Sequence, residues 1–153
     1  TGDGSRRGQG SGDPRTGDMA MQQAMQRLSA TLQMKQEIAD ILTEEQLTGW
    51  HDLRAREIER EFDNRMLAFQ VRLDDAGIAG EKQAAVLDLL RKEAVLAKEW
   101  RIRESSRMEM PDEEEAEALR AEREAMRESR SKTNEQIKDV LTANEYQQFR
   151  RRF

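Results

Sequence analysis

The sequence predicts an all-α protein made of long helices in an antiparallel hairpin arrangement, and three observations favour this fold class. First, 37% of the 153 residues are charged and 36% are hydrophobic, while only two prolines interrupt the chain. Second, the apolar residues recur at intervals of three and four, which is the spacing of one helix face. Third, no segment alternates β-branched and polar residues as a half-buried strand does. Such thin apolar stripes indicate extended helices around a modest core.

Residues 1–18 are predicted to form a disordered leader that precedes a single all-helical domain at 19–153. The leader contains six of the nine glycines and no large apolar residue, so it cannot offset the entropy lost on ordering. Two origins remain open for it: a native linker behind a processed signal, or an artificial extension.

The first helix is expected to run from Met19 to Ile41, with Asp18 as its N-cap. Its apolar stripe is rich in methionine, whose flexible thioether suits both an irregular core and an adaptable binding surface. Such a stripe more often packs in the core than forms a binding surface, and we favour the core for these methionines. The methionines concerned are Met19, Met21, Met25 and Met34.

A second helix is predicted to end near Asp75, and a third to run from Glu81 to about Met108. Between them Gly77 suits the left-handed residue that ends a helix, and so short a loop makes the two helices antiparallel neighbours. The third helix is the most apolar and is therefore the expected centre of the core. Gly49 lies inside the second helix at a cost of about 1 kcal/mol relative to alanine, which a close backbone approach by another helix would explain.

A fourth helix is predicted from Pro111 to about Val140, because proline followed by acidic residues is typical of a helix start. Its apolar stripe is weak, since its middle carries polar residues where a core helix carries apolar ones. Two interpretations follow: a solvated helix anchored at its two ends, which we slightly favour, or a seam that lines a groove for a partner. A short fifth helix ends at Phe153. The two heptad rows of the fourth helix are Leu119, Met126, Thr133 and Val140, and Ala116, Arg123, Arg130 and Ile137.

One motif occurs twice, 99 positions apart, and each copy predicts a corner between two helices. In this capping box the threonine oxygen accepts a hydrogen bond from the backbone N–H three residues later, and the side chain of that residue bonds back to the threonine N–H. The leucine before the threonine supplies a hydrophobic staple that sets the angle between the helices. The copies are Leu42, Thr43 and Gln46, and Leu141, Thr142 and Glu145.

These corners resemble the LTXXQ-motif periplasmic proteins of the Spy and CpxP type, which carry two such motifs. In both copies an aromatic residue follows the motif, as Trp50 and Phe149. The resemblance implies a cradle-like antiparallel dimer in the bacterial periplasm that acts as an ATP-independent chaperone or as an envelope-stress adaptor. The chain departs from the family pattern at Glu145, where the family has glutamine, and between the motifs only the composition is similar.

Composition argues against several other functions. The net charge of −5, with basic and acidic residues interleaved, does not favour nucleic acid as a partner. The absence of cysteine excludes thiolate catalysis and cysteine-based metal sites. His51 is the only histidine, so neither a catalytic triad nor a histidine metal site within one chain is indicated. We therefore expect neither enzyme activity nor a cofactor, and no apolar run reaches the roughly 20 residues of a membrane span.

The expected function is to hold unfolded or partly folded client proteins on a shallow amphipathic helical surface, without nucleotide. Weak apolar contacts would capture the client, and dense mixed charge would keep the complex soluble. Two alternatives stay open: a structural helical dimer that docks on one envelope protein, and a metal-linked stress sensor. The client-binding residues predicted from the apolar pattern are Phe62, Met66, Phe69 and Met126.

Overall fold

The computed structural model describes residues 14–153, and this range is helical throughout apart from short connections, which confirms the predicted all-α class. No strand occurs among these residues. The helices are α1 (Pro14–Ile41), α2 (Glu44–Asp75), α3 (Gly80–Ser105), α4 (Glu113–Val140) and α5 (Ala143–Arg152).

The first helix begins at Pro14, five residues earlier than predicted. Proline suits this place, because its fixed φ fits the first helical turn and its missing N–H would have no helical partner there. Asp18 therefore lies inside α1 and does not cap it. Most of the predicted disordered leader, residues 1–13, lies outside the described residues.

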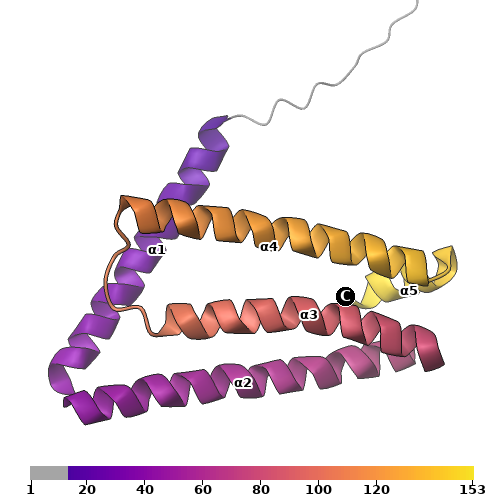
Figure 1. Cartoon of the computed structure of the whole chain (residues 1–153), viewed down its shortest axis with the longest axis horizontal. Helices are drawn as coiled ribbons and strands as arrows, with labels where there is room; N and C mark the ends of the chain where they lie inside the picture. The colour runs from indigo at the N-terminus through magenta and orange to yellow at the C-terminus, as the bar shows by residue number, and fades with distance from the viewer. Residues whose placement is uncertain (1–13) are drawn as a thin grey trace, which may run out of the picture.

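Three long helices form the body of the molecule (Figure 1). α2, α3 and α4 lie side by side with α3 in the middle, and each runs opposite to its neighbour. The 32 residues of α2 span about 48 Å at 1.5 Å per residue. α5 folds back beside the end of α4, whereas α1 crosses the body obliquely near its other end. Different helices therefore lie at the two ends of the body.

Both repeated motifs form the predicted capping boxes. At the first corner the Gln46 N–H donates to Thr43 Oγ1 at 3.2 Å, and the Thr43 N–H donates to Gln46 Oε1 at 3.0 Å. At the second corner Thr142 and Glu145 exchange the same two bonds, at 2.9 and 3.2 Å. The glutamate thus caps its helix as the glutamine does, because either side chain offers an oxygen to the threonine N–H.

The turn between α2 and α3 ends α2 as predicted, with Gly77 in the left-handed region at φ 74°. The Gly77 N–H donates to the Asp74 carbonyl and the Ile78 N–H to the Leu73 carbonyl, both at 3.0 Å, which is the paired bonding of a Schellman motif. Ile78 is fully buried. The turn therefore ends one helix and also places an apolar anchor in the core.

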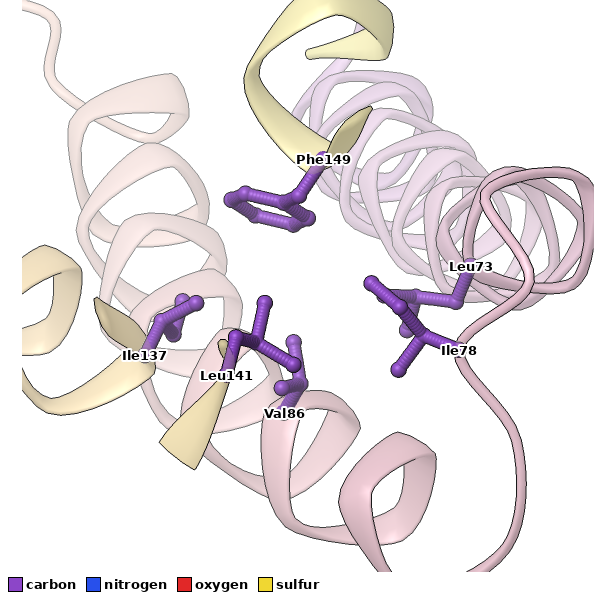
Figure 2. Close-up of a cluster of buried hydrophobic side chains, with 6 residues drawn as sticks. All are labelled: Leu73, Ile78, Val86, Ile137, Leu141 and Phe149. Atoms are coloured by element: carbon purple, nitrogen blue, oxygen red, sulfur yellow. The ribbon is translucent and has the colours of Figure 1, made fainter. Parts of the chain in front are cut away.

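The main apolar core lies at the end of the body where the α2–α3 turn meets α5, as Figure 2 shows. Six side chains meet there, and none of them exposes more than 6% of its surface. α3 contributes Val86, and its Leu89 and Leu90 pack against the cluster. The six residues are Leu73, Ile78, Val86, Ile137, Leu141 and Phe149.

The two corners differ in burial although their sequences match. Leu141 belongs to the core, whereas Leu42 is only half-buried. Ile41, which precedes the first corner, is 82% exposed. The second corner therefore closes the core, and the first turns α1 away from it.

Gly49 lies on an exposed part of α2, and a Cβ added there would meet no atom within 4 Å. The close backbone approach predicted for this glycine is therefore wrong. Among the described residues nothing explains why position 49 is glycine, and its cost to the helix is not offset by a contact.

Candidate functional site: a groove along α3

A groove runs along α3 between α2 and α4. Its first part, which we call the Phe69 crevice, is a cavity of about 240 Å³ with walls from all three helices. Apolar and basic side chains share these walls. The lining residues are Arg65 and Phe69 of α2, Leu90, Glu93, Ala94 and Ala97 of α3, and Met126, Arg127, Arg130, Thr133 and Asn134 of α4.

The second part, the Trp100 crevice, is a cavity of about 290 Å³ that α1 covers. A smaller crevice between α2 and α3 shares Arg65 and Ala97 with the first part and Ile58 and Arg101 with the second, so the two parts are neighbours along α3, and we call them together the central groove. The Trp100 crevice is lined by Met21, Ala24, Met25, Leu28, Thr31 and Lys35 of α1, Arg54 and Ile58 of α2, Trp100, Arg101, Glu104 and Ser105 of α3, and Ala116, Leu119, Arg120 and Arg123 of α4.

The central groove is basic although the chain carries a net charge of −5. Eight basic side chains line its two parts, against two acidic ones, Glu93 and Glu104. Half of the basic side chains are arginines of α4 at intervals of three and four residues, which places them on one helix face. Folding thus separates charges that are interleaved in the sequence. The four arginines are Arg120, Arg123, Arg127 and Arg130.

The middle of α4 packs on α3 through a polar contact. Thr133 is buried and its hydroxyl donates to Glu93 Oε1 at 2.9 Å, while the Ser129 hydroxyl donates to the same oxygen. A partly buried carboxylate needs such donors, because leaving it without partners is costly. The slightly favoured view of α4 as a solvated helix held only at its ends is therefore wrong. The alternative was a seam that lines a groove for a partner: α4 does line the groove, and the partner stays a prediction.

Two guanidinium groups lie over aromatic rings in the groove. Arg65 lies 5.5 Å from the ring centroid of Phe69, and Arg123 lies 5.6 Å from that of Trp100. Such cation–π contacts hold the charged groups against the apolar wall. The Trp100 Nε1 is buried without a hydrogen-bond partner in the described part of the chain. A ligand that carries carboxylate groups would find positive charge here.

Two of the four predicted client-binding residues meet in the groove. Phe69 and Met126 both line the Phe69 crevice, although Phe69 exposes only 8% of its surface. Phe62 lies nearby between α2 and α3, with Lys98 Nζ 4.7 Å from its ring centroid. Met66 lines a separate crevice and is not part of the groove. The apolar pattern therefore identified two residues that line the groove and missed the arginines, whose regular spacing along α4 is the signal that could reveal them.

α1 is fastened to the body by two polar side chains, Lys35 and Gln36, which we call the latch. Lys35 Nζ donates to three carbonyl oxygens at the end of α3, at 2.9 to 3.3 Å. Gln36 Nε2 donates to the Met108 carbonyl at 3.1 Å. A cation is favourable at this place, because the last carbonyls of a helix lack helical partners and carry partial negative charge. The three carbonyls bound by Lys35 belong to Glu104, Ser105 and Arg107.

The position of Lys35 changes its protonation equilibrium. Burial lowers the pKa of Lys35 below the ordinary value of 10.5, and the charges of Arg54 and Arg107 lower it further, whereas Glu104 acts in the opposite direction. The ammonium group thus loses hydration at this site, and the three carbonyl oxygens replace the lost water contacts.

Among residues 14–153 no group of three or more histidine, cysteine, aspartate or glutamate side chains could hold a metal ion. None of the helices in this range is long and apolar enough to cross a membrane. His51 lies beside Trp50, with ring centroids 5.2 Å apart, and its Nδ1 is buried without a hydrogen-bond partner in the described residues.

The fold and the site define an all-helical protein with one elongated groove that is basic and partly apolar. No family model, curated protein or solved structure matches the chain. The inference about function therefore depends on the chemistry of the groove itself.

Proposed function

We propose that this protein is an ATP-independent chaperone that holds unfolded or partly folded client proteins in the central groove. One observation carries the proposal: the groove combines an apolar floor with a rim of arginines. Apolar contacts of modest area bind an exposed client segment weakly, and arginine binds both carboxylates and aromatic faces. Weak mixed contacts suit a protein whose clients must also leave.

The dimensions of the groove favour a segment of a protein chain as its ligand. Its α3 wall runs from Leu90 to Ser105, which is about 22 Å, or roughly four helical turns. Met126 lines the Phe69 crevice and Met21 and Met25 line the Trp100 crevice, and such flexible side chains adapt to ligands of different shape. The excess of positive charge would favour acidic client segments and speed their encounter.

The resemblance to LTXXQ-motif proteins adds a location and an assembly to the proposal: the bacterial periplasm, and a cradle-like antiparallel homodimer. Apolar side chains of α2 would support such an interface, since Leu67 and Val71 are 62% and 57% exposed and lie four residues apart on one face. Analytical ultracentrifugation tests the dimer. Leu67→Lys should halve the mass of the dimer, and an unchanged mass would place the interface elsewhere.

The same exposed face favours a second candidate, a structural dimer that docks on one envelope protein and holds no clients. In that case the apolar side chains of α2 would be covered in a fixed interface. Binding of a dye that fluoresces on exposed apolar surface separates the candidates, because it should be strong for a client holder and weak for a sealed assembly.

The main experiment measures light scattering while a denatured acidic protein is diluted into buffer without ATP and with increasing amounts of this protein. We expect suppression that saturates at a fixed molar ratio. The double variant Arg127→Glu with Arg130→Glu reverses charge on the α4 wall of the groove and should lose most of the suppression. The matched control is Lys132→Glu with Lys138→Glu, which makes the same charge change on exposed α4 residues outside the groove lining.

Each outcome of this experiment has a defined meaning. If the control suppresses aggregation like the wild type and the groove variant does not, the groove is the client site. If both double variants suppress equally, with unchanged circular dichroism spectra, the groove is not the site. Absence of suppression by the wild type at a several-fold excess would favour the structural dimer instead.

A further inference from the structure

We propose that α1 is a displaceable lid over the Trp100 crevice, and that acidic amphipathic client segments compete with α1 for this end of the central groove. This inference rests on the proposed function, because it concerns the regulation of the same site. Four features of α1 support it: the wall that it covers, the space that it leaves, its fastening and its hinge.

Of the α1 side chains that line the crevice, Lys35 carries a positive charge and the others are neutral, and the wall opposite them is also positively charged. Met25 and Leu28 line the crevice from α1, and no acidic side chain of α1 does so. On the opposite wall, Arg120 and Arg123 have no carboxylate oxygen within 4 Å among the described residues. α1 therefore covers the apolar part of the groove but supplies no negative charge to the arginines of its wall. A helical segment with carboxylates beside its apolar stripe would complement both properties.

α1 does not fill the space that it covers. An open crevice of about 290 Å³ remains between α1 and the body, so α1 and the facing walls are not packed together along their whole length. Trp100 lines this crevice, and its Nε1 is buried without an acceptor among the described residues, which is an energetic cost of this arrangement. Both features reduce the free energy that the protein would lose if a client segment replaced α1 over the crevice.

The fastening of α1 is confined to one part of the helix. The latch residues Lys35 and Gln36 make four hydrogen bonds to backbone carbonyls of the body. Leu32, one turn before the latch, is 2% exposed and adds an apolar anchor. Toward the start of the helix Met19 is 60% exposed. The part that covers the crevice therefore depends on the latch to stay in place.

The first capping-box corner supplies a hinge. The break at Leu42 and Thr43 separates α1 from α2, and the adjoining Ile41 is 82% exposed. Few apolar contacts therefore fix the angle between these two helices. The second corner cannot move in this way, because Leu141 lies in the core. Rotation at the first corner would move α1 as one unit, as in other hinged closures.

The first test uses a synthetic amphipathic peptide of about 15 residues, which matches the length of the groove wall, with glutamates on one face and leucines on the other. Fluorescence anisotropy measures its binding to the wild type, Lys35→Met and Lys132→Met. Lys35→Met removes the main part of the latch and should bind the peptide on the order of tenfold more tightly, because apparent affinity rises with the open fraction. Removing a groove cation would by itself weaken binding of an acidic peptide, so tighter binding points to the released lid.

Lys132→Met is the matched control, since it removes one positive charge from an exposed position outside the groove lining. It should bind the peptide as the wild type does. Equal or weaker binding by Lys35→Met, relative to the wild type, would contradict the proposal that α1 is a displaceable lid.

A covalent cross-link that holds α1 in place provides the opposite test. The chain has no cysteine, so Gln36→Cys combined with Met108→Cys places one thiol pair at the latch, where the two residues are in contact and neither lines the crevice. A short bifunctional maleimide then joins the two thiols. The joined protein should bind the peptide about tenfold more weakly than the same variant before joining. Equal binding before and after joining contradicts the proposal.

A third measurement separates the lid from the client-holding function. With Trp50→Phe, Trp100 is the single tryptophan, and quenching of its fluorescence by acrylamide reports how well α1 covers it. Quenching should increase when Lys35→Met is added and stay unchanged with Lys132→Met. Unchanged quenching with Lys35→Met overturns the lid whether or not clients bind. Increased quenching without peptide binding or aggregation suppression supports the lid and overturns the client-holding function.

Discussion

Thr133 of α4 donates its hydroxyl to the Glu93 carboxylate of α3 at 2.9 Å, and this contact joins the two helices where the apolar row of α4 becomes polar. Thr133 is 7% exposed, and Ser129 one turn earlier donates to the same oxygen. A buried hydrogen bond of this kind requires the two helices to meet in one register. The polar member of this heptad row therefore faces α3, so the row need not be apolar throughout to pack on that helix.

Replacement of Thr133 by valine tests the contribution of this contact. The variant keeps the shape of the side chain and removes one donor to Glu93, so the free energy of unfolding should fall by about 1 to 2 kcal/mol. Urea unfolding followed by circular dichroism measures the change. Equal or greater stability of Thr133→Val would show that the hydroxyl does not contribute.

The two capping-box corners allow a matched comparison of the same leucine in two environments. Leu141→Ala should lower the free energy of unfolding by about 2 to 4 kcal/mol, because it leaves a cavity in the core. Leu42→Ala should cost about 1 kcal/mol, since Leu42 is only half-buried. Similar losses in both variants would mean that the first corner is packed as tightly as the second.

Gly49 offers a stabilising substitution. Gly49→Ala should raise the free energy of unfolding by about 0.5 to 1 kcal/mol, because alanine favours the helix and its Cβ meets no atom within 4 Å. Gly77→Ala is the control and should be destabilising by about 1 to 2 kcal/mol, since Gly77 has φ 74°. Thermal unfolding compares both variants with the wild type, and a lower melting temperature for Gly49→Ala would contradict the expectation.

The second corner should weaken in acid. The ion pair of Glu145 with Lys82 Nζ, at 2.7 Å, and the hydrogen bonds of Glu145 with the backbone and side chain of Thr142 lower the pKa of Glu145 from 4.5 to about 2. Because the folded state holds the proton less tightly than the unfolded state, this contribution to stability is complete above pH 4.5 and is lost as the pH falls toward about 2.

Glu145→Gln isolates this titration, because glutamine keeps the capping oxygen and carries no charge. Between about pH 5 and pH 2 the wild type should lose more stability than the variant. Melting temperatures across this range measure the difference. An identical pH dependence of both proteins would mean that other carboxylates account for the acid effect.

Much of the local structure could be predicted from the sequence. The end of α2, the left-handed Gly77 and both capping boxes were predicted correctly, since each depends on residues a few positions apart. The start of α1 was predicted too late, because the run of glycines and polar residues concealed Pro14 as a possible first helical residue. For Gly49, the free-energy cost of a glycine inside a helix was wrongly taken as a sign that another helix approaches it closely.

The candidate site could be predicted only in part. Phe69 and Met126 follow the apolar spacing of their helices, and both line the groove. Met66 follows the same spacing and lies in another crevice, because spacing identifies a helix face but not the neighbour that covers it. The position of Lys35 at the end of α3 could not be predicted, since its partners lie about seventy positions further along the chain.

By itself the sequence determined the helices and their corners, because helix period, capping hydrogen bonds and the left-handed glycine act within a few residues of the chain. Only the tertiary structure decided which helix faces meet. Packing of α4 on α3 through Thr133 and Glu93 turns four arginines into one wall of a groove. It also buries Leu141 and leaves Leu42 half-exposed in the same motif, because burial depends on neighbours that are distant in the sequence.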